Sequence, residues 1–216
     1  IKTNFLGNEE YATNVRLAYE YYRKSNLSWP ALQILTYEIE SYWSSGNNEK
    51  VKELEVEAAN IYLAEPDKKI RALDGYHLGI LYGQNNRASL GLEYLFNAEE
   101  LLLDINEKDL LKNVYQSIGM VYWFVSNNEK SLEYAYKDLK LRKELNFYEG
   151  IAQAYQNIVA NLFYLNRIDS IPAEYQNYLQ EFITDSTSYY YGAQMMRLQG
   201  RMLIKQGKYQ EAIDII

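Results

Sequence analysis

The strongest constraint on the fold of this chain is a turn that recurs about every 40 residues along the sequence. The letters NNEK occupy residues 47–50 and again 127–130, and a near copy, NNRA, occupies 85–88. Residues able to adopt the left-handed conformation that ends a helix recur with the same period: Gly46, Asn86, Ser126, Asn166 and Gly207. The recurrence predicts five helix C-termini in a stack of similar helical units.

Each of these turns follows a segment with the apolar spacing of one helix face. Seven residues before each turn lies a small or aliphatic residue, and a Tyr or Leu follows three positions later. The pairs are Ile39 with Tyr42, Gly79 with Tyr82, Gly119 with Tyr122, Val159 with Leu162 and Gly200 with Leu203. We predict that each pair belongs to a first helix, helix A, and that the pairs form a packed column between repeats.

A second helix, helix B, is predicted after each turn, most clearly at 50–65, 88–104 and 129–145. In the second repeat the NN letters are two residues out of step with Gly79 and Tyr82, so a shorter first helix or a different turn is expected there. The whole pattern predicts an orphan helix and five repeats. Their ranges are 9–24 for the orphan helix and about 29–65, 66–104, 107–145, 147–184 and 188–216 for the repeats.

Composition supports a single all-α array over residues 1–216 and limits its partners. Only three prolines and 11 glycines interrupt the chain, which favours long helices. No apolar run reaches the length of a membrane span, and a net charge of -7 without a basic block disfavours binding to nucleic acid. The absence of cysteine excludes disulfides and favours an export history over a cytosolic one, although the compartment stays open.

The segment GRMLIKQGKYQEAIDII at 200–216 resembles the tetratricopeptide signature, with Gly200, Leu203, Gly207, Tyr209, Ala212 and Ile216 at its characteristic intervals. Residues 131–167 resemble the longer, roughly 40-residue form of this repeat. The resemblance implies a right-handed α-solenoid whose helices A line an inner groove. Arrays of this long form are common in the regulatory regions of bacterial sensor kinases and transcription regulators, and both ends of this chain are expected to continue into a longer protein.

Residues that could carry chemistry are few, and their patterns favour structural roles. His77 is the only histidine, and with no cysteine in the chain it has no companions for a metal site. Paired carboxylates such as Glu99 and Glu100 match solvated helix faces, and no glycine-rich phosphate loop or nucleophile motif is present. We therefore expect no enzyme activity, no cofactor and no metal.

The resemblance also implies a candidate binding surface on the inner face of helices A. The expected groove residues are Trp43, Gln116, Trp123, Phe124, Gln156, Phe163, Tyr164, Arg197 and Arg201. Aromatic rings and amides suit an extended peptide, a protein segment or an apolar small ligand, and the arginines favour an acidic group at their end. The alternative, that the rings only pack against neighbouring helices, stays open.

Two functions follow from this interpretation. The first is a non-catalytic module that binds a peptide, protein or ligand as the sensory or regulatory part of a bacterial signalling protein. The second is an assembly scaffold or adaptor for protein complexes that senses nothing. Because one scaffold of this kind serves many functions, the residues do not decide between the two.

Overall fold

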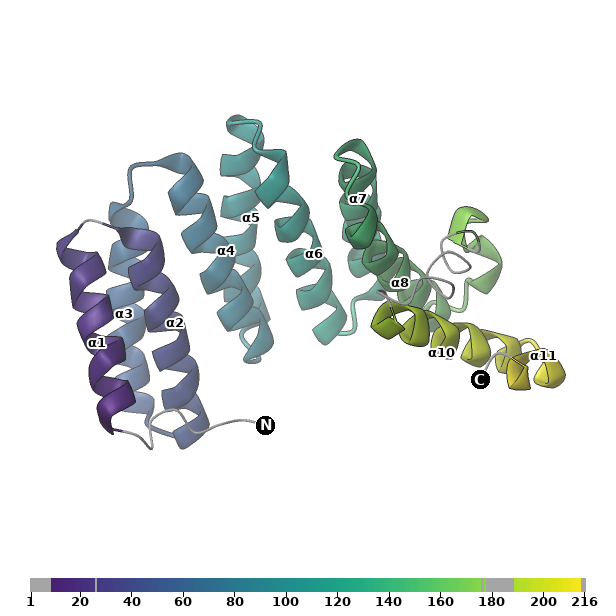
Figure 1. Ribbon diagram of the computed structural model, residues 1–216, viewed down its shortest axis with the longest axis horizontal. Helices are drawn as coiled ribbons and strands as arrows, with labels where there is room; N and C mark the ends of the chain where they lie inside the picture. Colours follow the sequence, from purple (N-terminus) through teal and green to yellow (C-terminus); the bar gives the residue numbers. More distant parts are fainter. Residues whose placement is uncertain (1–8, 26, 176, 178–188, 215–216) are drawn as a thin grey trace. The chain divides into compact units, whose positions relative to one another are not determined.

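The computed structural model of the protein describes residues 9–25, 27–175, 177 and 189–214. Every regular element in this part of the chain is helical, which confirms the all-α prediction there (Figure 1). The elements are α1 (Glu9–Lys24), α2 (Ser28–Ser45), α3 (Asn48–Ala64), α4 (Lys68–Gln84), α5 (Ala88–Asp104), α6 (Lys108–Phe124), α7 (Asn128–Glu144), α8 (Tyr148–Tyr164), the short 3-10 helix η2 (Ile168–Ser170), α10 (Tyr189–Lys205) and α11 (Tyr209–Ile213).

Contacts divide the chain into two compact units, unit 1 (residues 1–114) and unit 2 (residues 115–216), with the division inside α6. In unit 1, α2 packs against α1, α3 and α4, and α4 packs against α5 (Figure 1). In unit 2, α7 packs against α8, and α8 packs against α10. Helices packed pairwise in chain order are consistent with an α-solenoid.

The predicted turns are confirmed, because all five residues have a positive φ. The values are +78° at Gly46, +61° at Asn86, +59° at Ser126, +59° at Asn166 and +77° at Gly207. After each of these residues, the next backbone N–H donates to a carbonyl five residues earlier, which closes the helix end. The accepting carbonyls belong to Tyr42, Tyr82, Tyr122, Leu162 and Leu203, the residues of the predicted column.

The expectation of a shorter helix or a different turn in the second repeat is wrong. Helix α4 has 17 residues, the same length as α6. Asn86 after α4 and Ser126 after α6 both have the left-handed backbone conformation. The NN letters differ in role instead. Asn47 and Asn127 are N-caps whose side chains accept from the backbone N–H of the third residue onward, whereas Arg87 occupies that position before α5 without a side-chain cap.

Each unit has its own apolar core, built from the predicted helix faces. Unit 1 buries residues such as Leu32, Leu35, Ile39, Leu54 and Leu78, and unit 2 buries residues such as Leu139, Tyr155, Ile158, Leu162 and Tyr175. The column side chains are buried at Tyr82, Leu162 and Leu203 and half-buried at Tyr42 and Tyr122. The packing that the spacing predicts is therefore present within each unit.

Two helices approach each other closely at Gly79 but not at Gly119. A Cβ added to Gly79 would lie 2.5 Å from Leu95 Cγ and 3.0 Å from the carbonyl oxygen of Gly91, so α4 and α5 pack backbone against backbone. At Gly119 the nearest atom would be 3.4 Å away, an ordinary contact. The role of the recurring glycine therefore differs between repeats.

Some predictions fall outside the described residues. The second helix of the repeat predicted at 147–184 falls, beyond residue 177, among residues that the structure does not describe. The same holds for residues 215 and 216. Within the part that the structure describes, none of the helices combines the length and the apolar character that a membrane span needs.

Candidate binding pocket

A pocket of about 410 Å³ lies in unit 2, bordered by residues of α6, α7, α8 and α10. Its walls carry four aromatic residues, five carboxamides and two arginines. The aromatic residues are Tyr115, Trp123, Phe124 and Tyr164; the carboxamides are Gln116, Gln153, Gln156, Asn157 and Asn161; the arginines are Arg197 and Arg201. We call this the unit 2 pocket.

Three of the four aromatic residues of the unit 2 pocket lie in the last turns of α6 and α8, and the fourth, Tyr115, lies in the middle of α6. The rings of Trp123 and Tyr164 meet edge to face, with centroids 4.9 Å apart and planes inclined at 84°. Phe124 is 53% exposed and Tyr164 is 54% exposed, so much of their apolar surface faces solvent. Burial of such rings against a ligand is the main source of affinity that this wall can supply.

Gln116 is held in place by a buried ion pair. Nη2 of Arg142 donates to Oε1 of Gln116 at 2.7 Å, and Nε of Arg142 donates to Oδ1 of Asp138 at 2.6 Å. The side chains of Arg142 and Asp138 are 3% and 0% exposed. Removal of both charges from water is tolerated because they pair and hydrogen-bond at short range. The pair thereby fixes the side chain of Gln116 on the pocket wall.

Asn161 occupies the pocket wall in a different way. It is 1% exposed, and its Nδ2 donates to the backbone carbonyl of Asn157 at 2.8 Å. Its Oδ1 is buried and has no hydrogen-bond partner among the described residues. A buried acceptor in this state is unusual in folded proteins.

The described residues that line the unit 2 pocket carry positive charge, although the chain as a whole is acidic. Although the net charge is -7, none of the described residues that line the pocket is Asp or Glu. Arg197 and Arg201 are exposed, and neither forms an ion pair with another described residue. The pocket therefore favours a neutral or anionic group over a cation.

The sequence-predicted site residues fall into two groups. Seven of the nine line the unit 2 pocket: Gln116, Trp123, Phe124, Gln156, Tyr164, Arg197 and Arg201. Trp43 does not, because it belongs to unit 1, where its ring meets that of Tyr82 at 6.0 Å and packs against the core. Phe163 does not line the pocket either, because it packs against the unit 2 core.

The ring of Phe163 nevertheless supports the basic end of the pocket. The guanidinium carbon of Arg201 lies 4.8 Å from the centre of this ring, and Nζ of Lys205 lies 4.7 Å from it. Cation–π contacts of this kind hold a basic side chain while leaving its donors available. Phe163 is thus a support for the pocket instead of a part of its wall.

Sequence reasoning missed Asn161, Arg142 and Asp138. The i, i+4 spacing of Asp138 and Arg142 on one helix was visible in the sequence, and it usually indicates an exposed pair. Nothing local shows that both are buried, or that Arg142 reaches Gln116, 26 residues away. Asn161 carried no signal, because its side chain bonds within its own helix.

Unit 1 contains a smaller pocket, of about 180 Å³, which we call the unit 1 pocket. It is lined by Gln33, Thr36, Tyr37, Glu40, His77, Ile80, Leu81, Gln84 and Asn85. The His77 ring contacts the rings of Trp29 and Tyr76, and burial lowers the pKa of His77 below its usual range. No group of three or more His, Cys, Asp or Glu among the described residues could hold a metal ion.

Comparison with known proteins supports the fold. No protein-family model matches the chain, and no curated protein matches it. Among solved structures, the chain is similar to the crystal structure of BtubC (BKLC) from P. vanneervenii, with a TM-score of 0.77 and 14% sequence identity. The match covers 94% of this chain and 86% of that chain. At this identity, the likeness concerns the fold and not the function.

Proposed function

We propose that this chain is a non-catalytic binding module of the tetratricopeptide type, and that the unit 2 pocket holds an extended segment of a partner polypeptide. The observation that carries the proposal is the composition of the pocket wall: aromatic rings, five carboxamides, two unpaired arginines and no carboxylate among the described lining residues. Rings supply contact area, and amides match the donors and acceptors of a peptide backbone.

The size and charge of the pocket agree with such a partner. A volume of about 410 Å³ lies in the range of ligand pockets, and it suits a few residues of a peptide. Arg197 and Arg201 favour a segment with an acidic group at their end of the pocket, from a side chain or from a C-terminus. We further propose that binding serves a sensory or regulatory role in a bacterial signalling protein. This part of the proposal rests on the resemblance of the long repeats to those of such proteins. The right-handed twist of the solenoid stays a prediction.

Selection from a displayed library of random dodecapeptides tests the proposal. Selected peptides would be synthesised with a fluorescent label, and their affinity for the protein measured by anisotropy. Trp123→Ala should weaken binding at least about tenfold, because truncation of a central aromatic contact typically costs about 2 kcal/mol. The matched control is Tyr209→Ala, since Tyr209 is 65% exposed and does not line the pocket.

Two outcomes would argue against this function. If no peptide is selected, or if Trp123→Ala and Tyr209→Ala bind the selected peptides equally well, the unit 2 pocket is not a peptide site. Hydrogen exchange with and without peptide separates the sensory role from the scaffold role. A sensor should show altered exchange in helices away from the pocket, whereas a scaffold should show protection at the pocket alone.

A further inference from the structure

The unit 1 pocket, lined by residues of α2 and α4, has the opposite charge from the unit 2 pocket. Glu40 is the one charged residue among the described residues that line it, because burial disfavours the charged form of His77. The carboxylate of Glu40 forms no ion pair or hydrogen bond with another described residue. Unit 1 as a whole has 18 acidic and 12 basic residues. An unpaired carboxylate in acidic surroundings attracts a cation.

Tyr37 adds an aromatic ring beside this carboxylate. It lies three residues before Glu40, so the two residues share one face of α2. Tyr37 is 64% exposed, and its ring contacts neither another ring nor a basic side chain among the described residues. Elsewhere in unit 1 a tyrosine ring already holds a cation, since the guanidinium carbon of Arg87 lies 4.7 Å from the centre of the Tyr82 ring. The open ring of Tyr37 suits a cation of the same kind.

Asn85 supplies a further hydrogen-bond acceptor to the unit 1 pocket. Its Nδ2 donates to the backbone carbonyl of Leu81 at 2.7 Å. Because a carboxamide oxygen cannot donate to a carbonyl, this bond fixes the orientation of the amide. Oδ1 makes no hydrogen bond with another described residue, and the side chain is only half-buried. This oxygen is therefore free to accept an N–H from a ligand.

The size and the apolar part of the pocket restrict the kind of cation. A volume of about 180 Å³ is below the range of about 300–1,000 Å³ that is usual for ligand pockets, so the ligand is small. Ile80 and Leu81 line the pocket with Glu40, and apolar side chains beside a carboxylate suit an alkyl stem. A hard metal ion prefers six or more oxygen ligands, and the one carboxylate of this pocket does not provide them.

We propose that the unit 1 pocket binds a small organic cation, a primary ammonium or a guanidinium on a short alkyl stem. Glu40 is its counter-ion, the Tyr37 ring covers the charge, and Oδ1 of Asn85 accepts one N–H. Free amines carry this group, and so do the lysine and arginine side chains of a partner protein. Binding here does not depend on the peptide proposed for the unit 2 pocket.

Nuclear magnetic resonance tests the site through His77, which lines the pocket and is the only histidine of the chain. In protein without a histidine tag, the ring C–H signals of His77 are the only imidazole signals. At about pH 7.5 the probe n-butylamine is fully protonated, and n-butanol is its neutral control. We expect n-butylamine to shift the His77 signals saturably and to bind at least about tenfold more tightly than n-butanol. Equal binding of the two probes, or no shift with n-butylamine, would overturn the proposal.

Two variants at exposed positions separate the carboxylate of the pocket from the general acidity of unit 1. Glu40→Gln should weaken n-butylamine binding at least about tenfold, because it removes an acceptor that is paired with a charged donor. The control, Glu100→Gln, removes the same charge from an exposed position of α5 that does not line the pocket, and it should change binding less than about twofold. Tyr37→Leu should weaken binding about two- to fivefold. Equal losses in the two glutamate variants would overturn the role of Glu40.

A third probe identifies the source of the cation. N-acetyl-lysine methylamide carries the same butylammonium group on a peptide backbone. If it binds within about threefold of n-butylamine, the pocket accepts a lysine side chain of a partner; if it binds at least about tenfold more weakly, the pocket is closed to the backbone and the ligand is a free amine. Failure of both probes to shift the His77 signals would overturn the cation site and leave the peptide site of unit 2 standing.

Discussion

Each unit contains a fully buried aspartate, and the two aspartates have opposite surroundings. Asp138 in unit 2 is 0% exposed and pairs with Arg142, which continues to Gln116 on the wall of the unit 2 pocket. Asp74 in unit 1 is also 0% exposed, but neither of its oxygens has a hydrogen-bond partner of ordinary geometry among the described residues. Asp138 is thus linked through Arg142 to the unit 2 pocket, whereas Asp74 is not paired in this way.

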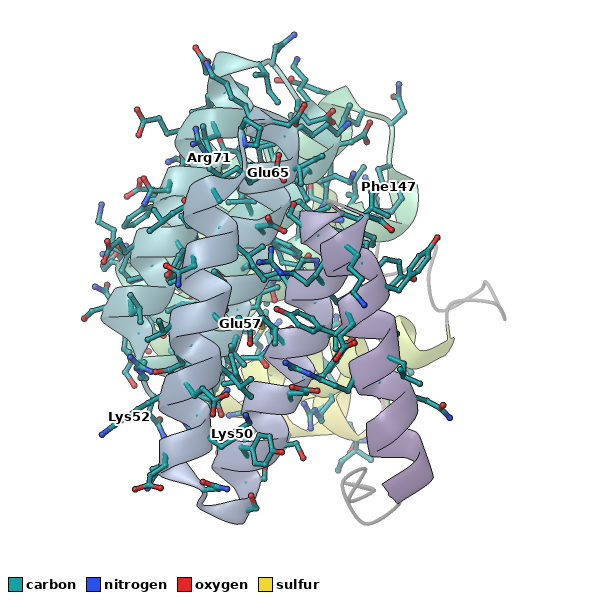
Figure 2. All side chains as sticks on the ribbon, turned by 90° about the vertical axis from the view of Figure 1, so that its left-hand side faces the viewer. Lys50, Lys52, Glu57, Glu65, Arg71 and Phe147 are labelled. Atoms are coloured by element: carbon teal, nitrogen blue, oxygen red, sulfur yellow. The ribbon has the colours of Figure 1, made fainter. Side chains whose placement is uncertain are left out.

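The surroundings of Asp74 favour its neutral form. Burial raises the pKa of Asp74 to about 7, and the nearby carboxylate of Glu65 adds to the shift, while the Ser28 hydroxyl opposes it. Glu65 lies at the C-terminal end of α3 (Figure 2). It is itself buried and accepts a hydrogen bond from the Ser28 hydroxyl. A cation stabilises the buried carboxylate of Asp138, whereas protonation is favoured at the buried carboxyl of Asp74.

The pockets of the two units differ in a related way. Positions 40 residues apart carry Thr36, Tyr76, Gln116 and Gln156 in one row, and Glu40, Ile80, Met120 and Ala160 in another. The unit 1 pocket includes the carboxylate of Glu40 and measures about 180 Å³, whereas the unit 2 pocket has small or neutral residues at the equivalent places and measures about 410 Å³. Side chains at repeated positions, and not the helix scaffold, decide which pocket suits an anionic partner.

The largest effect is expected from breaking the ion pair of unit 2. Arg142→Met removes the guanidinium beside Asp138 and leaves a buried carboxylate without its cation, which typically costs about 3–5 kcal/mol of unfolding free energy. The control, Arg167→Met, breaks the exposed pair with Glu129 and should cost less than about 1 kcal/mol. Urea unfolding followed by circular dichroism measures both, and similar losses would show that Asp138 does not depend on Arg142.

The next largest effect concerns the unsatisfied aspartate of unit 1. Because the folded-state pKa of Asp74, about 7, lies above its ordinary value of 3.8, the folded state holds the proton more tightly than the unfolded state. The unfolding free energy should therefore fall as pH rises from about 4 to about 8. Asp74→Asn, which carries no charge at any pH, should remove this contribution and exceed the wild type in stability above pH 8 by on the order of 3 kcal/mol.

Hydrogen exchange of α4 peptides at about pH 5 and pH 8.5 locates this effect in unit 1. At the lower pH, wild type and Asp74→Asn should differ less than at pH 8.5, because the folded carboxyl is still protonated at pH 5 and most of the loss of stability comes between pH 5 and pH 8. The prediction has the wrong sign if α4 of the wild type becomes better protected than α4 of Asp74→Asn as the pH rises.

The smallest of the three effects compares two glycines. A Cβ on Gly91 would lie 2.6 Å from the backbone nitrogen of Gly83 and 2.8 Å from the carbonyl oxygen of Gly79, and backbone atoms cannot move aside. Gly91→Ala should cost about 1–3 kcal/mol. Gly119→Ala in unit 2 meets nothing closer than 3.4 Å and should be neutral or stabilising by up to about 1 kcal/mol, since alanine is the better helix former. Equal destabilisation in the two variants would show that glycine serves the same purpose in both units.

The sequence by itself determined the helices and the turns that end them, because these depend on neighbouring residues. All five predicted turn residues have positive φ, and the orphan helix was expected where α1 lies, from Glu9 to Lys24. Asn106 and Asn146, which lie 40 residues apart, also have positive φ and carry the same local signal in the sequence. A backbone conformation that asparagine and glycine tolerate can be predicted without knowledge of the rest of the chain.

Seven of the nine residues that the resemblance to the tetratricopeptide family indicated line the unit 2 pocket, and their role in binding stays a prediction. Only the tertiary structure decided that Phe163 supports the wall, that Arg142 hydrogen-bonds to Gln116, and that Oδ1 of Asn161 has no hydrogen-bond partner among the described residues. These outcomes depend on how closely side chains from different helices approach and on which of them are shut away from water. The repeat period predicts which helix face a residue occupies, but it does not predict which side chain of another helix contacts that residue.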